Sequence, residues 1–486
     1  MIINVSKQRW FYFLCSIFFI INFTAIAFDF YWVSIVPIIL FFCFLLLFKV
    51  DVIILALAFL VPLSIRFDDI GFGLGINVPD EPLIITVAIV AVFKFFIDEE
   101  YDFKVFRHPI TFVILFHLFW IFITSCFSEF PVVSFKYFVS RLWYVIVFYF
   151  LGVILFKHFN NIKKYLWLYI ISLTVVVVIT LYKHSKYNFS LSKSYTIIEP
   201  FFIDHGIYAA TITLFMPMLV CFALFNRKIG LNFFGWMTSL IVLTIFSFGI
   251  YFSYTRAAWI SIVVAAALVI PLILRIRFNI ILLTLFSLSV LTYSFQDEIV
   301  YAFSKNEQKS ADGFLQHFQS ISNIKTDPSN TERINRWTSA IAMFEEKPVL
   351  GFGPGAFSFC YAPYQQFKYK TVISTNFGDG GNAHSEYLNP LAEAGLIGLL
   401  SILLIIYFVL NTGFRLYYSA RKIKIQIFSI AITLGIVTYF VHGIMNNYFE
   451  SDKIGAVLWA FFGMLTAMDL YHDKQKKNKL IMHELQ

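Results

Sequence analysis

The sequence predicts an all-α polytopic membrane protein, and three observations indicate this class. Of the 486 residues, 59% are hydrophobic and 14% are charged, whereas soluble proteins are close to half apolar and a quarter charged. The mean hydropathy is +0.77. The apolar residues fall in many separate runs of about 20 residues, the length at which a helix crosses a bilayer.

We expect about 12–14 transmembrane helices, because about fourteen runs are candidates and the short ones at 51–66 and 82–97 could be re-entrant. The first run lacks a small-residue cleavage site and is directly followed by another, which favours a retained span over a signal peptide. The candidates are residues 10–28, 30–48, 51–66, 82–97, 109–126, 135–156, 164–182, 206–225, 232–252, 257–275, 278–295, 387–411, 426–446 and 453–470.

The Lys and Arg residues predict the orientation, since short cytoplasmic loops are enriched in them. With a cytoplasmic N-terminus, every inside segment is basic, so the net charge of +8 reflects topology and not a nucleic-acid surface. These segments carry Lys7, Arg9, Lys49, Lys104, Arg107, Lys157, Lys163, Lys164, Arg227, Lys228, Arg275, Arg277, Arg415, Arg421, Lys422, Lys424, Lys474, Lys476, Lys477 and Lys479. Acidic outside loops such as Asp68–Asp69 agree.

The predicted organisation follows from this topology. An N-terminal transmembrane bundle spans residues 1–295, and a polar loop of residues 296–386 lies outside the cytoplasm. C-terminal transmembrane helices span 387–470, and a basic tail, 471–486, is cytoplasmic. A loop of this length is usually functional.

The loop has predicted structure of its own. Ser329 and Glu332 fit a capping box, and apolar residues then recur at helical spacing until Pro348. Residues 351–355, Gly-Phe-Gly-Pro-Gly, predict a tight turn. They follow no parallel strand and open no βαβ unit, so nucleotide binding is disfavoured.

Four ionisable residues are predicted to converge at the outer interface. Arg141 lies in the start of the sixth run, His205 begins the eighth, Arg256 lies between the ninth and tenth, and His384 lies where the loop re-enters the membrane. An Arg there is often a snorkelling anchor, and a His at a helix start is often a cap. Convergence from four segments favours a site.

The local sequence indicates a specific role for two of these residues. Arg256 is followed by two alanines, which leave its guanidinium room to grip a phosphate bidentately. We expect His384 in the first turn of a helix, where the dipole lowers the imidazolium pKa and leaves a neutral base.

Two carboxylates lie nearby in the sequence. Glu386 either orients His384 or is a solvated helix-start residue, and the second role is favoured. Glu393 falls inside an apolar run, where a carboxylate is a functional candidate. Its small neighbours equally suit close helix packing, so both interpretations stay open.

The predicted location of the site outside the cytoplasm limits the donor substrates that an enzyme could use there. ATP and nucleotide sugars are cytoplasmic, so an enzyme working outside needs a donor already activated in the membrane, such as a polyprenyl-pyrophosphate-linked sugar. Cations near the breaking bond would stabilise the pyrophosphate leaving group. The loops contain no Asp-x-Asp motif or metal-ligand cluster and the five cysteines are scattered, so we expect neither metal nor cofactor.

Four motifs in this order resemble the O-antigen ligase and polymerase superfamily of bacterial membrane glycosyltransferases. They are Ser-Tyr-Thr-Arg-Ala-Ala-Trp at 253–259, Asn-Thr-Glu-Arg-Ile-Asn-Arg-Trp at 330–337, Pro-Val-Leu-Gly-Phe-Gly-Pro-Gly at 348–355 and Asn-Ala-His-Ser-Glu-Tyr-Leu at 382–388. Each motif alone is weak, and the resemblance covers about 200–411.

The resemblance implies a metal-independent, inverting transfer of a glycan from undecaprenyl pyrophosphate to lipid A–core on the periplasmic face of the bacterial inner membrane. It implies His384 as the base and Arg256 as a pyrophosphate-binding residue, with Arg141 as a less firmly matched second cation. The family's Asn-His pair has an inserted alanine here, so either Asn382 or Ser385 supplies the neighbouring hydrogen bond.

Arg333 and Arg336 lie three apart on the loop helix, where they either reach a phosphate or, as we favour, are solvated.

Other functions remain open at this stage. A polymerase of the same superfamily would extend one lipid-linked glycan with another, and other ligases would use another glycolipid or a protein hydroxyl as acceptor. A transporter or flippase is disfavoured, because transporters place ionisable residues near the bilayer midplane, often within inverted repeats.

Overall fold

The computed structural model describes residues 5–30, 33, 44–46, 48–67, 75–97, 102–284, 287, 328–371, 374 and 381–472. The chain divides into two units, Met1–Ala56 and Leu57–Gln486. Most of the predicted span 30–48, the Asp68–Asp69 loop, residues 288–327 of the predicted 278–295 span and polar loop, and the tail from 473 lie outside the described residues. Helix α1, Val5–Ala27, belongs to the first unit and covers the predicted first span.

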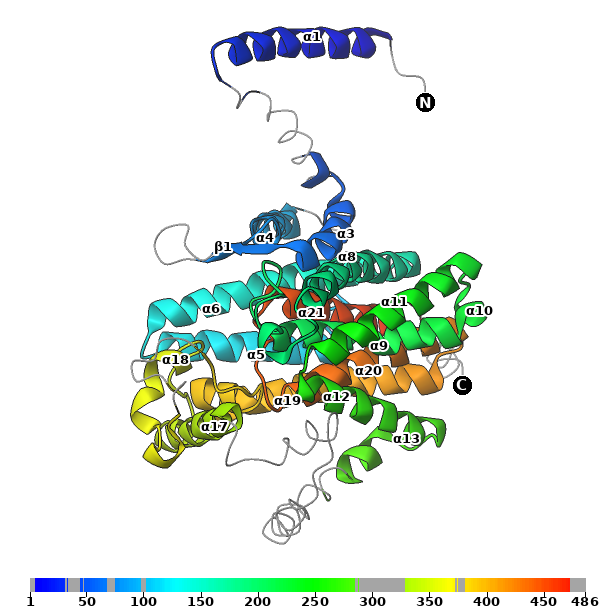
Figure 1. The fold of residues 1–486 in the computed structure, drawn as a ribbon. Coiled ribbons are helices and arrows are strands. Elements are labelled where there is room, and N and C mark those ends of the chain that lie inside the picture. The colour runs from blue at the N-terminus through cyan, green and yellow to red at the C-terminus, as the bar shows by residue number, and fades with distance from the viewer. Residues whose placement is uncertain are drawn as a thin grey trace, which may run out of the picture. The chain divides into compact units, whose positions relative to one another are not determined.

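Nine helices in the described ranges are long and apolar enough to cross a membrane, and each coincides with a predicted span (Figure 1). The protein is therefore an all-α, multi-pass membrane protein, as predicted. The nine are Pro109–Cys126 (α5), Pro131–Leu155, Phe159–Ser185 (α8), His205–Leu224 (α9), Phe233–Phe252 (α11), Arg256–Ile273, Leu388–Ser419 (α19), Ile423–His442 (α20) and Asp452–His472.

Three of these spans are composite. Pro131–Leu155 consists of α6 (Pro131–Tyr144), the π-helical η3 (Val145–Phe150) and α7 (Leu151–Leu155). Arg256–Ile273 consists of α12 (Arg256–Ala267) and α13 (Val269–Ile273), and Asp452–His472 of α21 (Asp452–Ala467) and π-helical η7 (Met468–His472). Short elements connect the spans: η4 (Leu191–Lys193) and α10 (Asn226–Ile229).

The predicted span 51–66 ends earlier than expected. Helix α3, Val50–Leu60, and the 3-10 helix η2, Val61–Leu63, are followed by an antiparallel hairpin of β1, Ile65–Phe67, and β2, Ile76–Val78. Pro62 lacks a backbone N–H, so the helical hydrogen bonding stops there. Helix α4, Asp80–Ile97, covers the predicted span 82–97.

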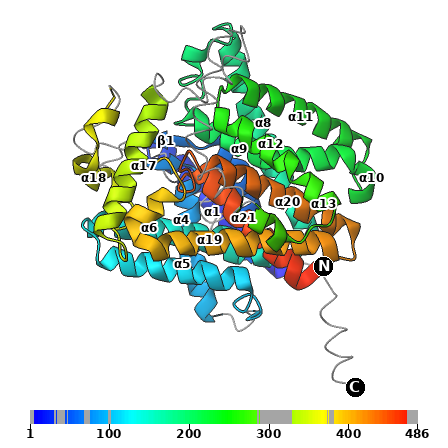
Figure 2. The same ribbon diagram turned by 90° about the horizontal axis from the view of Figure 1, so that it is seen from below.

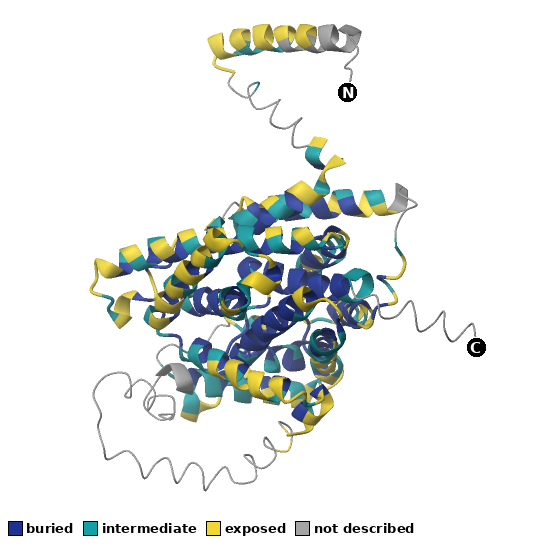
Figure 3. Ribbon diagram, turned by 90° about the vertical axis from the view of Figure 1, so that its right-hand side faces the viewer, coloured by how far each residue is buried: buried dark blue, intermediate teal, exposed yellow. Residues whose placement is uncertain are grey.

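Helix α20 forms the centre of the bundle. It packs against α9, α19 and α12, and α19 in turn packs against α5 (Figure 2). Dark, buried ribbon therefore marks the middle of the bundle, while the outer helices are exposed on one side (Figure 3). In a membrane protein such exposed apolar faces meet lipid.

The end of the bundle where α5 begins and α19 ends is held by a three-residue clamp. The Asp469 carboxylate lies 3.0 Å from His108 Nε2 and 2.6 Å from Arg415 Nη2. These residues come from the start of α5, from α19 and from η7. The basic segments predicted to be cytoplasmic within the described bundle gather at this end.

The opposite end carries the site-forming segments, and here α19 is broken. Gly395 has φ 68° and ψ −167°, outside the helical region, so carbonyl groups before it are free to accept bonds from elsewhere. Phe352 N–H donates to Ala392 O at 3.1 Å and Gly353 N–H to Glu393 O at 2.8 Å. The predicted tight turn at 351–355 is confirmed, with positive φ at its three glycines.

The loop helix is α17, Pro328–Glu346, and it packs along α19. It begins one residue before the predicted cap, with Pro at its first position. The Glu332 carboxylate, predicted to cap this helix, pairs with Arg336 one turn later. The short helices α18 (Phe357–Cys360), η5 (Ala362–Tyr364) and η6 (Phe367–Tyr369) follow.

Gly395→Ala should destabilise the bundle by at least about 2 kcal/mol, because a left-handed residue with a Cβ costs about 1–2 kcal/mol and the close contact adds to this. A Cβ at this position would lie 2.1 Å from Val349 O. Thermal unfolding in detergent should show a lower midpoint. Gly152→Ala, in a helix where the nearest atom is a Phe156 side-chain carbon at 3.3 Å, is the matched control. Equal midpoints for both variants would contradict the role of the break.

Candidate functional site

His384 lies in a short segment before α19, not in its first turn. The helix begins at Leu388, and His384 has φ 48°, the left-handed region that side chains rarely adopt. The prediction of a helix-start histidine is therefore wrong. Ser385 Oγ accepts from the N–H groups of Tyr387 and Leu388, at 3.3 and 3.4 Å, and so forms a turn that leads from the histidine into the helix.

Three hydrogen bonds fix the His384 segment. His384 N–H donates to Asn382 Oδ1 at 2.9 Å, and His384 O accepts from Trp337 Nε1 at 3.3 Å. Asn382 Nδ2 donates to Asn447 O at 3.0 Å, in the connection between α20 and α21. The sequence left open whether Asn382 or Ser385 supplies the hydrogen bond next to His384, and in the structure Asn382 supplies it, to the histidine backbone. Strained backbone held this firmly is typical of functional sites.

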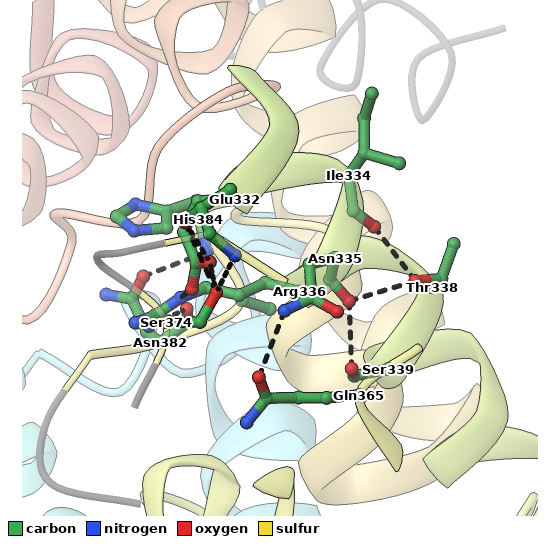
Figure 4. A network of polar contacts seen from close by, with 12 residues as sticks. Glu332, Ile334, Asn335, Arg336, Thr338, Ser339, Gln365, Ser374, Asn382 and His384 are labelled. Carbon is green, nitrogen blue, oxygen red and sulfur yellow. Dashed lines mark hydrogen bonds and ion pairs between the residues drawn. The ribbon is translucent and has the colours of Figure 1, made fainter. Parts of the chain in front are cut away.

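Arg336 is buried, not solvated as favoured from the sequence, with 6% of its surface exposed. Its Nε donates to Glu332 at 2.8 Å, and Nη1 donates to Asn382 O at 3.0 Å. Figure 4 shows this arginine between Glu332 and the Asn382 segment. Gly381 permits the approach, since a Cβ there would lie 1.9 Å from Arg336 Nη1. Arg336 therefore ties the His384 segment to α17.

Arg333 is half-buried one turn before Trp337. Its Nε donates to Met445 O at 3.3 Å, which ties α17 to the connection after α20. The guanidinium lies within electrostatic range of His384, His205 and His442. The structure thus gathers three histidines around one arginine.

His205 is the first residue of α9. Its Nδ1 lies 3.3 Å from the carboxylate of Asp204, and Asp204 caps the helix by accepting from Gly206 N–H at 2.6 Å. Tyr448 Oη donates to the same carboxylate at 3.1 Å. The predicted cap role therefore belongs to Asp204, and the His205 ring lies edge-on to Tyr195.

Burial, together with the charges of Arg336 and Arg333, lowers the pKa of His384 from its ordinary value of 6.5 to about 3. The imidazole is therefore neutral at physiological pH, the state that a general base requires. Its Nδ1 is enclosed and, among the described residues, has no hydrogen-bond partner. The expected neutral ring is present, but its cause is burial and arginine charge, not a helix dipole.

Glu386 is neither solvated nor bonded to His384. It is buried and accepts hydrogen bonds from the N–H groups of Tyr448 and Phe449, at 2.7 and 2.9 Å, and from the Tyr439 hydroxyl. Burial raises the pKa of its carboxyl group to about 7, although these three hydrogen bonds oppose the rise. Glu386 joins the start of α19 to the connection between α20 and α21.

Glu393 is buried and connects two segments through hydrogen bonds. Its carboxylate accepts from Phe357 N–H at 3.0 Å and from Asn389 Nδ2 at 2.9 Å, while Asn389 Oδ1 accepts from Ala383 N–H at 3.1 Å. The carboxylate therefore connects the 351–357 turn to the residue next to His384. Its contacts combine the packing and polar roles that the sequence left open.

Arg141 and Arg256 lie at the same end of the bundle on other helices. Arg256 is half-buried at the start of α12, which packs on α20 and α9, and among the described contacts none joins it to His384. Arg141 lines a pocket of about 20 Å³ that also contains Glu386, Glu393 and Asn447. His384 is not in the lining of that pocket.

Several residues of this end were missed from the sequence. They come from the segment after α20: His442, whose ring nitrogens are enclosed without partners in the described contacts, and Asn447, Tyr448 and Glu450. A histidine at the end of an apolar run followed by two asparagines was the available signal. The described residues contain no group of His, Cys, Asp and Glu able to hold a metal ion.

The site and fold define a multi-pass membrane protein with a polar centre at one end of its helices. Residues 240–403, from α11 through the loop to α19, match the family model described as O-antigen ligase. The matched stretch contains Arg256, Arg333, Arg336 and His384, and the match confirms the resemblance to the O-antigen ligase superfamily that the motifs predicted. No curated protein matches the chain.

Arg333→Gln should raise the pKa of His384, because it removes one of two cations that disfavour the imidazolium. In the wild type the ring should stay neutral as the pH falls through 6.5, and the variant should protonate at a higher pH. NMR titration of labelled histidines measures this, with the signal assigned by its loss in His384→Ala. Arg227→Gln is the charge-matched control. Superimposable His384 curves for wild type and Arg333→Gln would refute the assignment.

Proposed function

We propose that the protein is a membrane glycosyltransferase that moves a glycan from a polyprenyl-pyrophosphate carrier to an acceptor hydroxyl, with His384 as the base. The observation that supports this proposal most directly is the state of His384. Its ring is neutral and half-buried with an enclosed nitrogen, its backbone is strained, and two arginines lie near it. The O-antigen ligase match supports the reaction class. The donor is undecaprenyl pyrophosphate-linked by resemblance to that family.

The proposed step balances as a single inverting displacement. A ring nitrogen of His384 accepts the proton of the acceptor hydroxyl while the hydroxyl oxygen attacks the anomeric carbon of the donor glycan. The bond from that carbon to the pyrophosphate oxygen breaks, and the carrier pyrophosphate leaves from the opposite face. Arg333 and Arg256 bind the pyrophosphate and stabilise the charge that develops on it.

The pKa of His384 links donor binding to base strength. At a pKa of about 3 the imidazole is neutral but a weak base. Pyrophosphate bound at Arg333 places negative charge near the ring, which raises the pKa towards neutrality. His384 thus becomes a stronger base once the donor is present. Arg336 acts as a positioning residue, and the charge of Arg333 also acts on His205 and His442.

We propose that this centre faces the periplasm and that both termini are cytoplasmic, since the basic segments gather at the other end. Lipid A–core is the proposed acceptor. Another glycolipid or a protein is the alternative, and polymerisation of lipid-linked glycans is the second candidate function that the superfamily match supports.

His384→Ala should lower the transfer rate by at least about a hundredfold, the usual contribution of a general base. The assay is transfer from a lipid-pyrophosphate glycan to an acceptor by the purified protein in liposomes. His158→Gln, at the clamp end of the bundle, is the control and should keep full activity. Full activity in His384→Ala, at equal protein level, would exclude the mechanism.

Arg256→Lys should weaken donor use by about tenfold or more, because an ammonium cannot reproduce the two parallel hydrogen bonds that a guanidinium gives a phosphate. The loss should appear as a raised KM for the lipid-linked donor, with the KM for the acceptor unchanged. Wild-type kinetics would show that Arg256 is only an interfacial anchor.

Deletion of the gene separates the two candidate functions. Loss of a ligase should leave long polymer on the carrier lipid, because chains are made but not transferred. Loss of a polymerase should leave single repeat units on the acceptor. Electrophoresis of cell-envelope glycolipids distinguishes these products, and unchanged glycolipids would contradict both.

A further inference from the structure

A cavity of about 300 Å³ lies beside α6, and His384 is not among its lining residues. One face of α6 forms a wall, since the lining positions recur every three or four residues. The other walls come from the 351–355 turn, the connection between α20 and α21, and α21. The lining residues are Val133, Lys136, Tyr137, Ser140, Arg141, Tyr144, Gly355, Phe449, Glu450 and Trp459.

Arg141 is the central feature of this cavity. It lies ten residues after Pro131, about 15 Å along a helix that rises 1.5 Å per residue, so it is inside the span Pro131–Leu155. Only 7% of its surface is exposed. Among the described residues its guanidinium donates one hydrogen bond, 2.7 Å long, to Tyr137 Oη. A guanidinium has five N–H donors, so a buried one with a single bond is under-satisfied.

The rest of the lining indicates what would satisfy it. Lys136 and Arg141 contribute two positive charges against the single carboxylate of Glu450. The Phe449 ring lies 4.5 Å from the Arg141 guanidinium carbon, so the aromatic ring covers its face and leaves its N–H edge for a ligand. Ser140 and Glu450 add hydrogen-bonding groups suited to hydroxyls, and Tyr144 adds apolar surface.

We infer that this cavity binds one sugar residue that carries an oxyanion, either a carboxylate or a phosphate. Arg141 holds the oxyanion through its N–H edge, Ser140 and Glu450 bond the ring hydroxyls, and the aromatic wall covers one ring face. The volume is at the lower end of the range for small-ligand sites, which suits a single ring and not a long chain.

This site goes beyond the proposed transfer centre. Tyr137, Arg141 and Glu450 line both this cavity and the 20 Å³ pocket that contains Glu386 and Asn447. Asn447 O in turn accepts from Asn382 Nδ2, next to the His384 segment. The sequence grouped Arg141 with the pyrophosphate-binding residues, whereas its surroundings favour a separate sugar-acid site.

Isothermal titration calorimetry on the full-length protein in detergent tests the inference, with glucuronate, glucose 1-phosphate, glucose and inorganic pyrophosphate as probes. At least one acidic sugar should bind, and glucose should bind at least about tenfold more weakly, since it lacks the charge-assisted bonds. The two acidic sugars distinguish a carboxylate from a phosphate. Failure of both to bind would overturn the inference, as would equal binding of glucose or loss of pyrophosphate binding in Arg141→Gln.

Variants locate the binding. Arg141→Gln should weaken binding of the acidic sugar by at least about tenfold. Ser140→Phe should do the same by filling the cavity while leaving the Arg141 charge in place, which covers the case in which Arg141→Gln misfolds. Lys193→Gln is a surface control and should bind as the wild type does.

His384→Ala should also bind normally, so a failed transfer mechanism and a failed sugar site give different results. Wild-type affinity in both Arg141→Gln and Ser140→Phe would overturn the inference.

Discussion

The break of α19 at Gly395 is the constraint on which the candidate site depends. Without it, the carbonyls of Ala392 and Glu393 would be used inside the helix, and the 351–355 turn would have nothing to dock on. Trp120 Nε1 donates to Ala394 O at 2.8 Å, so α5 is fastened to the same break. The Glu393 carboxylate then reaches Asn389, which holds the residue before His384. One non-helical residue thus organises two helices, a loop turn and the histidine segment.

Much of the fold could be predicted from apolar runs, because the bilayer dictates their length. His384 and Arg256 could be proposed as candidates because their motifs are local. The position of His384 relative to α19 was wrong, since Asn382 and Ser385 compete for backbone amides that a helix would use. The roles of Arg336 and Glu386 depend on partners 46 to 63 residues away, which no local pattern contains.

Two kinds of polar burial occur at this end of the bundle. Arg336 and Glu332 are buried as a pair, with Ser374 also donating to the carboxylate, so their charges are compensated and serve structure. Arg141 has less compensation and lines open space, and His384 keeps an enclosed nitrogen without a described partner. Arg141 and His384, which are assigned to ligand binding and chemistry, are therefore among the incompletely satisfied groups, and the compensated pair helps to hold the site in place.

The burial of α20 has a consequence for how the protein is made. Of the nine candidate spans it is the most enclosed, because 89% of its most apolar 18 residues are buried, against 22% for Arg256–Ile273. Yet it is the second to last of these spans in the chain. Partners of earlier polar side chains also come late: His117 bonds Ser401, and Arg141 stacks on Phe449. During biosynthesis the first helices are therefore in the membrane before Ser401 and Phe449 are made, so His117 and Arg141 lack these partners there, which is energetically unfavourable. The bundle can therefore close around its centre only after the last helices have been inserted.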